Sequence, residues 1–298
     1  MNRSILFSMS ILIVLSSCQA QGEAENNMTS TNPSQTDRVH TDSIEISEDS
    51  GSMFSDLRKI QESLPPLIHS LDTFMVTFHQ INANFTQEEL DSSFHLYVEQ
   101  MKRIARRVGD LEQPTGEEQD QLNKDYRPYG FENHGNEGFM WLEINKSKAI
   151  DGFRKFVSDD LLAYAALDEV VIRQYVADES RLSSHEDWAD AVLELEDRLR
   201  ANQFSTYYTE FMNTYKSFLY SLMWGMERMP VLSWGDEPQL LDEVKSTYDR
   251  LIADETHKTG KIIEEHVKRM EEKDYKYNGE DQWFLTDKEV EHYLQLKH

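Results

Sequence analysis

The most regular hydrophobic pattern in the chain runs from Phe204 to Met229. Apolar side chains recur there at spacings of three and four, which is the period of one face of an α-helix. They are Phe204, Tyr208, Phe211, Tyr215, Phe218, Leu222, Met226 and Met229. In the second half, further apolar residues such as Tyr220 and Trp224 add to the sides of the stripe. The pattern predicts a central helix that ends at Pro230, with an amphipathic first half and a second half buried in a bundle.

The same spacing predicts three helices in the chain before residue 112. The first breaks at Pro65-Pro66, because proline lacks a backbone N–H and clashes with the preceding turn. A second helix is expected over residues 67–82. The third follows Thr86–Glu89, which has the form of a capping box. Its outer face carries a basic cluster that we interpret as a solvated or salt-bridged helix face. The cluster consists of Lys102, Arg103, Arg106 and Arg107.

The apolar pattern after residue 149 predicts the remaining helices. A long helix is expected over residues 150–175, with a step at Ser158, and another opens at Ser184–Asp187 and packs antiparallel to the central helix. Apolar residues from Leu241 to Met270 lie on one line of a single helix. A last short helix is capped at Thr286–Glu289. The predicted fold is all-α, an irregular bundle of about seven or eight helices.

Residues 112–138 interrupt the helical pattern with prolines, glycines and aromatic residues. We interpret them as one long loop, and its aromatic residues argue against simple disorder. Tyr129 and Phe131 in this loop are candidates for contact with a ligand or partner, as are Tyr220 and Trp224 on the central helix. The segment Phe139–Ile144 fits either a short strand or the first turns of a helix.

Composition and charge limit the classes of function. Of 298 residues, 39% are hydrophobic, which is enough for a real core and excludes wholesale disorder. The formal net charge of −25 opposes binding to nucleic acid and to bare anionic lipid. We therefore expect no nucleic-acid partner. The charge favours solubility and leaves cationic partners and bridging divalent ions open.

The N-terminus has the order of a bacterial lipoprotein signal. Arg3 is followed by an apolar segment, Ile5–Leu15, which is too short to span a bilayer as a helix. Leu15-Ser16-Ser17-Cys18 comes next and contains the only cysteine of the chain. This stretch resembles the lipobox of bacterial lipoproteins. The resemblance implies removal of residues 1–17 and acylation of Cys18, including palmitate, whereas the alternative is an ordinary secretory signal with a chance cysteine.

The segment after the lipobox predicts the domain organisation. Residues 18–51 are acidic, rich in polar side chains and without a hydrophobic period, so we expect a disordered tether. Residues 52–298 contain no second linker and are expected to form a single helical domain. Gln19 stands where inner-membrane retention signals have aspartate. The resemblance therefore implies an envelope protein anchored to the outer membrane, if the cell has two membranes.

Most sequence patterns of known catalytic sites are missing from the chain. It has no phosphate-binding glycine motif and no nucleophile elbow. His185-Glu186 begins like a zinc motif, but Ala189 occupies the position of the second histidine. Asp254 and His257 have the spacing of a di-iron ligand pair, yet on a continuous helix His257 would face water. His266 faces inward and is interpreted as a core residue.

His134 and Glu137 are the candidate metal ligands within the segment 125–138. They are three residues apart among glycines and can converge on a metal ion. The lipid-anchored, helical imelysin-like proteins carry a G-x-H-x-x-E motif, and this sequence is similar at His134 and Glu137 but has Glu132 in place of the glycine. The resemblance implies a metal-binding or metal-dependent envelope protein. A solvated loop is the alternative interpretation.

These observations favour a non-enzymatic, lipid-anchored cell-envelope protein whose helical domain binds a partner or acts as a scaffold. The lipobox, the tether and the lack of a catalytic motif support this hypothesis. No cofactor is expected. The expected partners are the membrane, through the anchor, and a protein or small molecule that the sequence does not identify. The rival hypothesis is the imelysin-like metal protein that uses the segment 125–138.

Overall fold

The computed structural model describes residues 50–109, 116–136, 139–180, 184–226, 229–233, 237–276 and 283–296. Cys18 and the predicted tether up to residue 49 lie outside these residues, as does Glu137. At His134 only the backbone is described. No helix in the described part of the chain combines the length and the apolarity that a membrane span requires.

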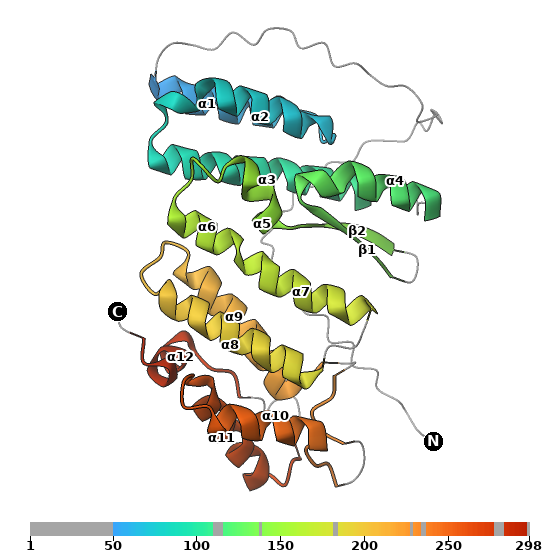
Figure 1. The fold of residues 1–298 in the computed structure, drawn as a ribbon, viewed down its shortest axis with the longest axis vertical. Helices are drawn as coiled ribbons and strands as arrows, with labels where there is room; N and C mark the ends of the chain where they lie inside the picture. Colours follow the sequence, from blue (N-terminus) through green and yellow to red (C-terminus); the bar gives the residue numbers. More distant parts are fainter. Residues whose placement is uncertain are drawn as a thin grey trace, which may run out of the picture. The chain divides into compact units, whose positions relative to one another are not determined.

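The described residues are mostly helical, which confirms the all-α prediction (Figure 1). The elements of the first half are α1 (Ser50–Ser63), α2 (His69–Ile81), α3 (Gln87–Gly109), α4 (Gly116–Tyr126), β1 (Phe131–Asn136) and β2 (Phe139–Ile144). Those of the second half are α5 (Lys146–Ala149), α6 (Asp159–Ala165), α7 (Leu167–Ser180), α8 (His185–Ala201), α9 (Tyr208–Trp224), α10 (Asp242–Ala253), α11 (Thr259–Glu272) and α12 (Asp287–Leu294). Figure 1 shows successive layers, from α1 and α2 through α3, α6–α7 and α8–α9 to α10–α12.

The prediction of seven or eight helices is wrong, in part because two long predicted helices are interrupted. The first is the helix expected over 150–175, which is divided into a turn after α5 and the helices α6 and α7. Ser158 caps the start of α6, since its hydroxyl accepts a hydrogen bond from the Leu161 N–H at 3.2 Å. The Ser158 hydroxyl in turn donates to Asp91 of α3 at 2.6 Å. The predicted step at this serine is therefore a helix boundary.

The second interrupted helix is the one expected from Leu241 to Met270. It is a hairpin, because α10 ends at Ala253 and α11 starts at Thr259. Asp254 opens the connection by accepting a hydrogen bond from the Thr256 N–H at 2.7 Å, which is an Asx-type turn. Both helices direct their apolar faces into the same core, so the hydrophobic line continues across the break.

The long loop predicted over residues 112–138 is also corrected. Within it lie α4 and the strand β1. β1 pairs antiparallel with β2, from Phe131 opposite Ile144 to Asn136 opposite Phe139. Of the two alternatives for Phe139–Ile144, the strand is therefore correct. The loop interpretation failed because α4 has almost no apolar residues, and a polar helix shows no hydrophobic period.

The central helix is α9, and it is shorter than predicted at both ends. Phe204 lies before the helix with 78% of its surface exposed, so it does not belong to the buried stripe. At the other end Gly225, with a φ of 77°, terminates the helix before Pro230 is reached. Trp188 near the start of α8 donates from Nε1 to the Phe218 carbonyl near the end of α9 at 3.0 Å. This bond confirms that α8 and α9 pack antiparallel.

The buried side chains form two core clusters rather than one. The first cluster comes from the chain up to Ala165, and the second comes from Leu167 onward. Tyr164 and Tyr207 pack against both clusters. Their rings stack with centroids 4.5 Å apart and planes 5° apart, and the Tyr207 hydroxyl lies 2.9 Å from His95 Nε2. The stacked tyrosine pair therefore connects the two cores.

Arg103 shows that the basic face of α3 has a structural role. Its guanidinium donates to the carbonyls of Gln61 at 2.9 Å and Leu64 at 3.0 Å, at the end of α1. These carbonyls lack partners within their own helix, because Pro65 cannot continue it. Lys102 pairs with Glu99 at 2.6 Å. The interpretation of this face as salt-bridged is thus correct for Lys102, whereas Arg103 caps a neighbouring helix.

Candidate functional site

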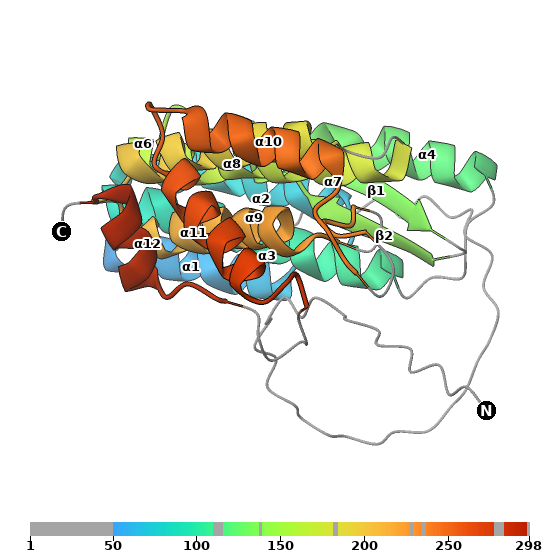
Figure 2. The ribbon, with the colours of Figure 1, turned by 90° about the horizontal axis from the view of Figure 1, so that it is seen from below.

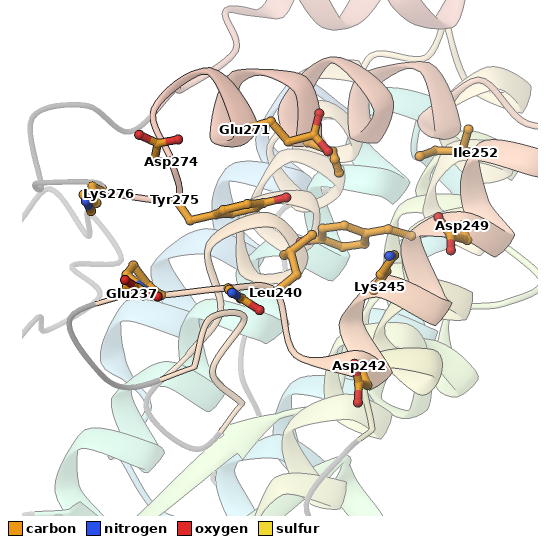
Figure 3. Close-up of a pocket in the computed structure, with 14 residues that line it drawn as sticks. Glu237, Leu240, Asp242, Lys245, Asp249, Ile252, Glu271, Asp274, Tyr275 and Lys276 are labelled. Atoms are coloured by element: carbon orange, nitrogen blue, oxygen red, sulfur yellow. The ribbon is translucent and has the colours of Figure 1, made fainter.

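The candidate site is a groove along the α10–α11 hairpin. Residues 237–242, α10 and the end of α11 with its following turn form its walls (Figure 3). The wall before α10 is held by antiparallel pairing, in which Ser233 N–H donates to Gln239 O at 2.8 Å and Leu241 N–H to Val231 O at 3.1 Å. In the view of Figure 2, α10, α11 and α12 lie in front of α8 and α9.

The spacing of the hairpin depends on Gly260 in the first turn of α11. A Cβ atom at this position would lie 2.2 Å from the carbonyl oxygen of Leu251 in α10 and 2.9 Å from its carbonyl carbon. Both contacts are with backbone atoms, which cannot rotate away as a side chain can. Only glycine allows α10 and α11 to approach this closely.

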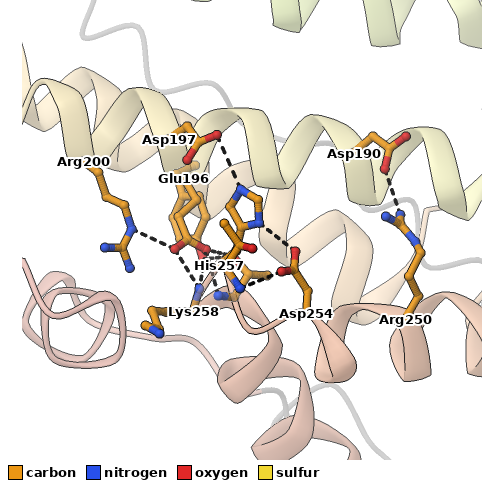
Figure 4. Close-up of polar contacts among 11 residues, drawn as sticks. Asp190, Glu196, Asp197, Arg200, Arg250, Asp254, His257 and Lys258 are labelled. Carbon is orange, nitrogen blue, oxygen red and sulfur yellow. Dashed lines mark hydrogen bonds and ion pairs between the residues drawn. The ribbon is translucent and has the colours of Figure 1, made fainter.

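A buried carboxylate attaches the hairpin to α8 (Figure 4). Glu196 has no exposed surface. Its oxygens accept hydrogen bonds from the backbone N–H groups of Lys258 and Thr259 at 2.8 Å and from Arg200 Nε at 2.8 Å. The Thr259 hydroxyl donates to Glu196 at 2.8 Å, and Tyr215 lies 2.8 Å from the same hydroxyl. Glu196 therefore caps the N-terminus of α11 from another helix, where a negative charge is favourable.

A second polar group lies at the edge of the same interface (Figure 4). His257 places Nδ1 2.7 Å from Asp254 and Nε2 3.4 Å from Asp197 of α8. Burial lowers the pKa of His257, but the two carboxylates outweigh burial and raise it, while the histidine bond holds the pKa of Asp254 at about 2. The expectation that His257 faces water on a continuous helix is wrong. It lies in the hairpin connection and joins it to α8.

The groove has an apolar floor and a charged rim, with a volume of about 700 Å³. The apolar side chains come from all three walls and are Leu240, Tyr248, Ile252, Val267 and Tyr275. The rim carboxylates are Glu237, Asp242, Asp249, Glu271 and Asp274. Two lysines, Lys245 and Lys276, share the rim. Among the described residues, neither lysine forms an ion pair. Because the rim has five carboxylates and only two lysines, its net charge is negative.

Tyr275 is placed in the groove by an unusual turn. Asp274 and Tyr275 have φ values of 50° and 57°, which non-glycine residues rarely adopt. The Tyr275 N–H donates to the Met270 carbonyl at 2.9 Å and closes the end of α11. Figure 3 shows the Tyr275 ring extending from this turn across the groove. Burial and the adjacent Glu271 raise the pKa of Tyr275, so its hydroxyl stays neutral at neutral pH.

His266 lies in the core behind the groove and has no exposed surface. Its Nε2 atom is 2.9 Å from the Met223 carbonyl, so this nitrogen carries the proton. Nδ1 is buried, and no described residue hydrogen-bonds to it. Trp224 meets the imidazole edge-on at 4.6 Å between centroids. Burial lowers the pKa of His266 to about 4, which confirms the interpretation of a neutral core histidine.

The buried neutral His266 predicts a pH dependence of stability. The unfolded state takes up a proton near pH 6.5, whereas the folded state does so only near its pKa of about 4. The contribution of the neutral His266 to the stability of the fold is therefore complete above pH 6.5, and it is lost as the pH falls from 6.5 to about 4. We expect the stability difference between the wild-type protein and His266→Gln to shrink by about 2 kcal/mol from pH 8 to pH 5. Urea unfolding at both pH values measures it, and an unchanged difference would contradict the prediction.

The residues proposed as contact sites from the sequence lie in different places. The Tyr129 hydroxyl donates to Asp72 of α2 at 2.8 Å. Phe131 is only 1% exposed and packs in the first core, where a partner cannot reach it. Tyr220 and Trp224 lie together, since both donate to the segment before α12, at the Leu285 carbonyl (2.6 Å) and the Trp283 carbonyl (3.4 Å). None of these residues lines the groove.

The groove residues were missed by reasoning from the sequence. They lie on α10, where Tyr248 belongs to the core, on α11 with its following turn, and on the stretch before α10, and only the hairpin brings them together. The Asx-type turn at Asp254 is the signal that could have indicated the hairpin. No local signal marks Tyr275 as part of a binding surface.

The candidate metal ligands lie mostly beyond what the structure describes. The backbone of His134 pairs with Trp141 in the β1–β2 ladder, and Glu137 lies outside the described residues. Within the described ranges, no three His, Cys, Asp or Glu side chains are grouped so that they could hold a metal ion. The metal hypothesis for this segment therefore stays a prediction.

Comparisons with protein-family models, with curated proteins and with solved structures gave no significant match to this chain.

Proposed function

We propose that this protein is a lipid-anchored cell-envelope protein whose domain, an irregular helical bundle, binds a ligand without catalysing a reaction. The groove along the α10–α11 hairpin is the binding site. The observation that carries the proposal is the combination of an apolar floor with a charged rim in a volume of about 700 Å³. The volume lies within the range typical of small-molecule sites, and the lining combines apolar side chains with seven charged ones.

The construction of the hairpin supports a binding role. Glu196 and Gly260 fix α10 and α11 to each other and to α8 through buried contacts. Such supports hold a site in one geometry, which reduces the entropy lost on binding. Among the described residues, the charged side chains of the rim form no ion pairs with one another or with the rest of the protein.

Filling the groove tests the binding role. Val267 lines the groove, whereas the next residue, Lys268, is exposed and lies outside it. A set of small fragments that includes cations, anions and neutral molecules is first screened for binding to the full chain by saturation-transfer NMR. We expect Val267→Trp to abolish the binding of the fragments found, because the indole ring would occupy the floor of the groove. Lys268→Trp adds the same ring outside the groove and should leave binding unchanged. The proposed function would be contradicted if the fragments still bound the Val267→Trp variant. It would also be contradicted if no fragment bound the full chain.

The anchor is proposed on the sequence Leu15-Ser16-Ser17-Cys18. Two or three acyl chains on Cys18 would hold the protein at a membrane almost permanently, since each buried methylene contributes about 0.8 kcal/mol. We expect wild-type protein in cells to incorporate labelled palmitate and Cys18→Ala to incorporate none. Ser17→Ala keeps a small residue before the cysteine and serves as the matched control. Equal labelling of wild type and Cys18→Ala would exclude the anchor.

The rival proposal is metal binding by His134 and Glu137. It is supported by their spacing among glycines and by the similarity to the imelysin-like motif. Metal analysis of the purified protein discriminates between the two proposals. Stoichiometric metal that is lost on His134→Ala would favour the metal protein.

A further inference from the structure

We infer that the groove along α10 and α11 takes a small organic cation with an apolar body, such as an aromatic or aliphatic amine. This inference rests on the proposed function, because it names the ligand class for the same site. It is carried by the charge of the rim, the position of the α11 terminus, the Tyr275 ring and the size of the groove.

The rim charge favours a cation. Five exposed carboxylates and two exposed lysines surround the apolar floor, so the rim carries more negative than positive charge. Asp242 stands in the first turn of α10, where the positive end of the helix dipole balances it. Glu271 and Asp274 stand at the end of α11 together with Lys276, and Asp249 stands on α10 one turn after Lys245, so negative charge outnumbers positive charge along the rim.

The C-terminus of α11 adds to the same preference. The last carbonyls of a helix carry a partial negative charge and favour cations close to them. The basic residue in the last turn is Arg269, which stacks on Trp283 at 4.2 Å and pairs with Glu265 at 2.9 Å. Arg269 is therefore already engaged outside the groove, whereas Lys273 and Lys276 follow the last turn of α11 and Lys276 stands on the groove rim.

The aromatic wall selects an organic cation over a metal ion. A cation near the face of a tyrosine ring is attracted by the ring quadrupole, and the apolar part of the ligand gains by burial. Tyr275 and Leu240 offer apolar surface among the carboxylates of the groove (Figure 3), and Val267 lines the same groove. A hydrated divalent ion would leave this surface unused, because hard cations prefer oxygen ligands alone.

The volume indicates a small molecule rather than a protein segment. About 700 Å³ lies within the range of about 300–1,000 Å³ typical of small-molecule sites. A stable protein interface would need about 800 Å² from each partner. The groove therefore fits an amine of drug-like size.

Three probes of similar shape and different charge test the inference on the full chain in non-ionic detergent. They are phenethylamine (cation), 2-phenylethanol (neutral) and 3-phenylpropanoate (anion). We expect phenethylamine to bind at least about tenfold more tightly than the anion, with the alcohol between them, and to weaken as salt rises. Titration followed by ligand-observed NMR measures the three affinities.

Paired substitutions locate the effect. Asp249→Asn combined with Glu271→Gln should weaken phenethylamine binding about tenfold. Glu255→Gln combined with Glu264→Gln removes the same charge from exposed positions outside the groove, and should change binding less than about twofold. Tyr275→Phe keeps the ring and should bind normally, whereas Tyr275→Leu should weaken binding several-fold. Circular dichroism verifies that each variant is folded.

The outcomes separate the ligand class from the proposed function. If the alcohol or the anion binds as tightly as the amine and Val267→Trp abolishes that binding, the cation inference is wrong and the groove remains a binding site. An equal loss in both pairs of acid variants would also overturn the inference, because only long-range charge would then act. If none of the three probes binds, the cation inference fails. If no fragment of the wider mixed-charge set binds either, or Val267→Trp leaves binding intact, the proposed function fails too.

Discussion

Replacing Glu196 with alanine is expected to lower the free energy of unfolding by about 3–5 kcal/mol. The carboxylate is fully buried and accepts hydrogen bonds from Arg200, from two backbone N–H groups and from the Thr259 hydroxyl. Its removal would leave the guanidinium without its partner and the first N–H groups of α11 without acceptors. Unpaired buried donors lose hydration without compensation, which makes the loss large. Urea unfolding of the purified chain measures the change.

Glu194→Ala is the matched control, because it is the same substitution on the same helix. Glu194 pairs with Arg173 and Arg198 at the surface, and exposed ion pairs contribute about 0–1 kcal/mol. We expect a loss below about 1 kcal/mol for this variant. Similar losses for the two variants would show that Glu196 does not hold the hairpin to α8.

Gly260→Ala is expected to destabilise the protein by about 3 kcal/mol or more. The new methyl group would lie 2.2 Å from the Leu251 carbonyl oxygen, far inside van der Waals contact. The hairpin can accept it only if α10 and α11 move apart, which would also widen the groove. The unfolding free energy and the affinity for phenethylamine should therefore fall together in this variant.

Gly109→Ala provides the comparison for this prediction. A Cβ atom on Gly109 would meet nothing within 4 Å, and its φ is not positive. Alanine also restricts the unfolded chain more than glycine does, so this variant should be neutral or slightly stabilising. If both variants were neutral, the close approach of α10 and α11 would have no energetic role.

The sequence predicts the helical class and several helix boundaries, because these depend on local patterns. The capping boxes at Thr86, Ser184 and Thr286 are all formed. Pro65-Pro66 separates α1 from α2 as predicted. Periodicity failed where two helices share one core, as in the α10–α11 hairpin, and where a helix has no apolar face, as in α4. Hydrophobic spacing reports which residues are buried, and it does not report whether the chain reverses between them.

The candidate site was much less predictable than the fold. Phe131 was singled out because it is aromatic within an irregular segment, yet it belongs to the core. Glu196 reads as an ordinary helix-surface acid, since its partners at Lys258 and Thr259 are remote in sequence. The groove depends on the reversal after Ala253 and on the left-handed turn at Tyr275. Such features follow from tertiary packing and have no fixed spacing along the chain.

The division of the buried side chains at residues 165–167 has a consequence for the order of folding. Each core is built from a continuous part of the sequence, so most of its contacts form without waiting for distant segments. Proteins fold from the N-terminus first during synthesis, so a core confined to the N-terminal part of the chain can form before the rest is made. All buried side chains of the first core have been synthesised once Ala165 has emerged, before α8 or α9 exists. It can then serve as a template on which the second half docks, with Tyr207 stacking on the already positioned Tyr164 as the two halves join.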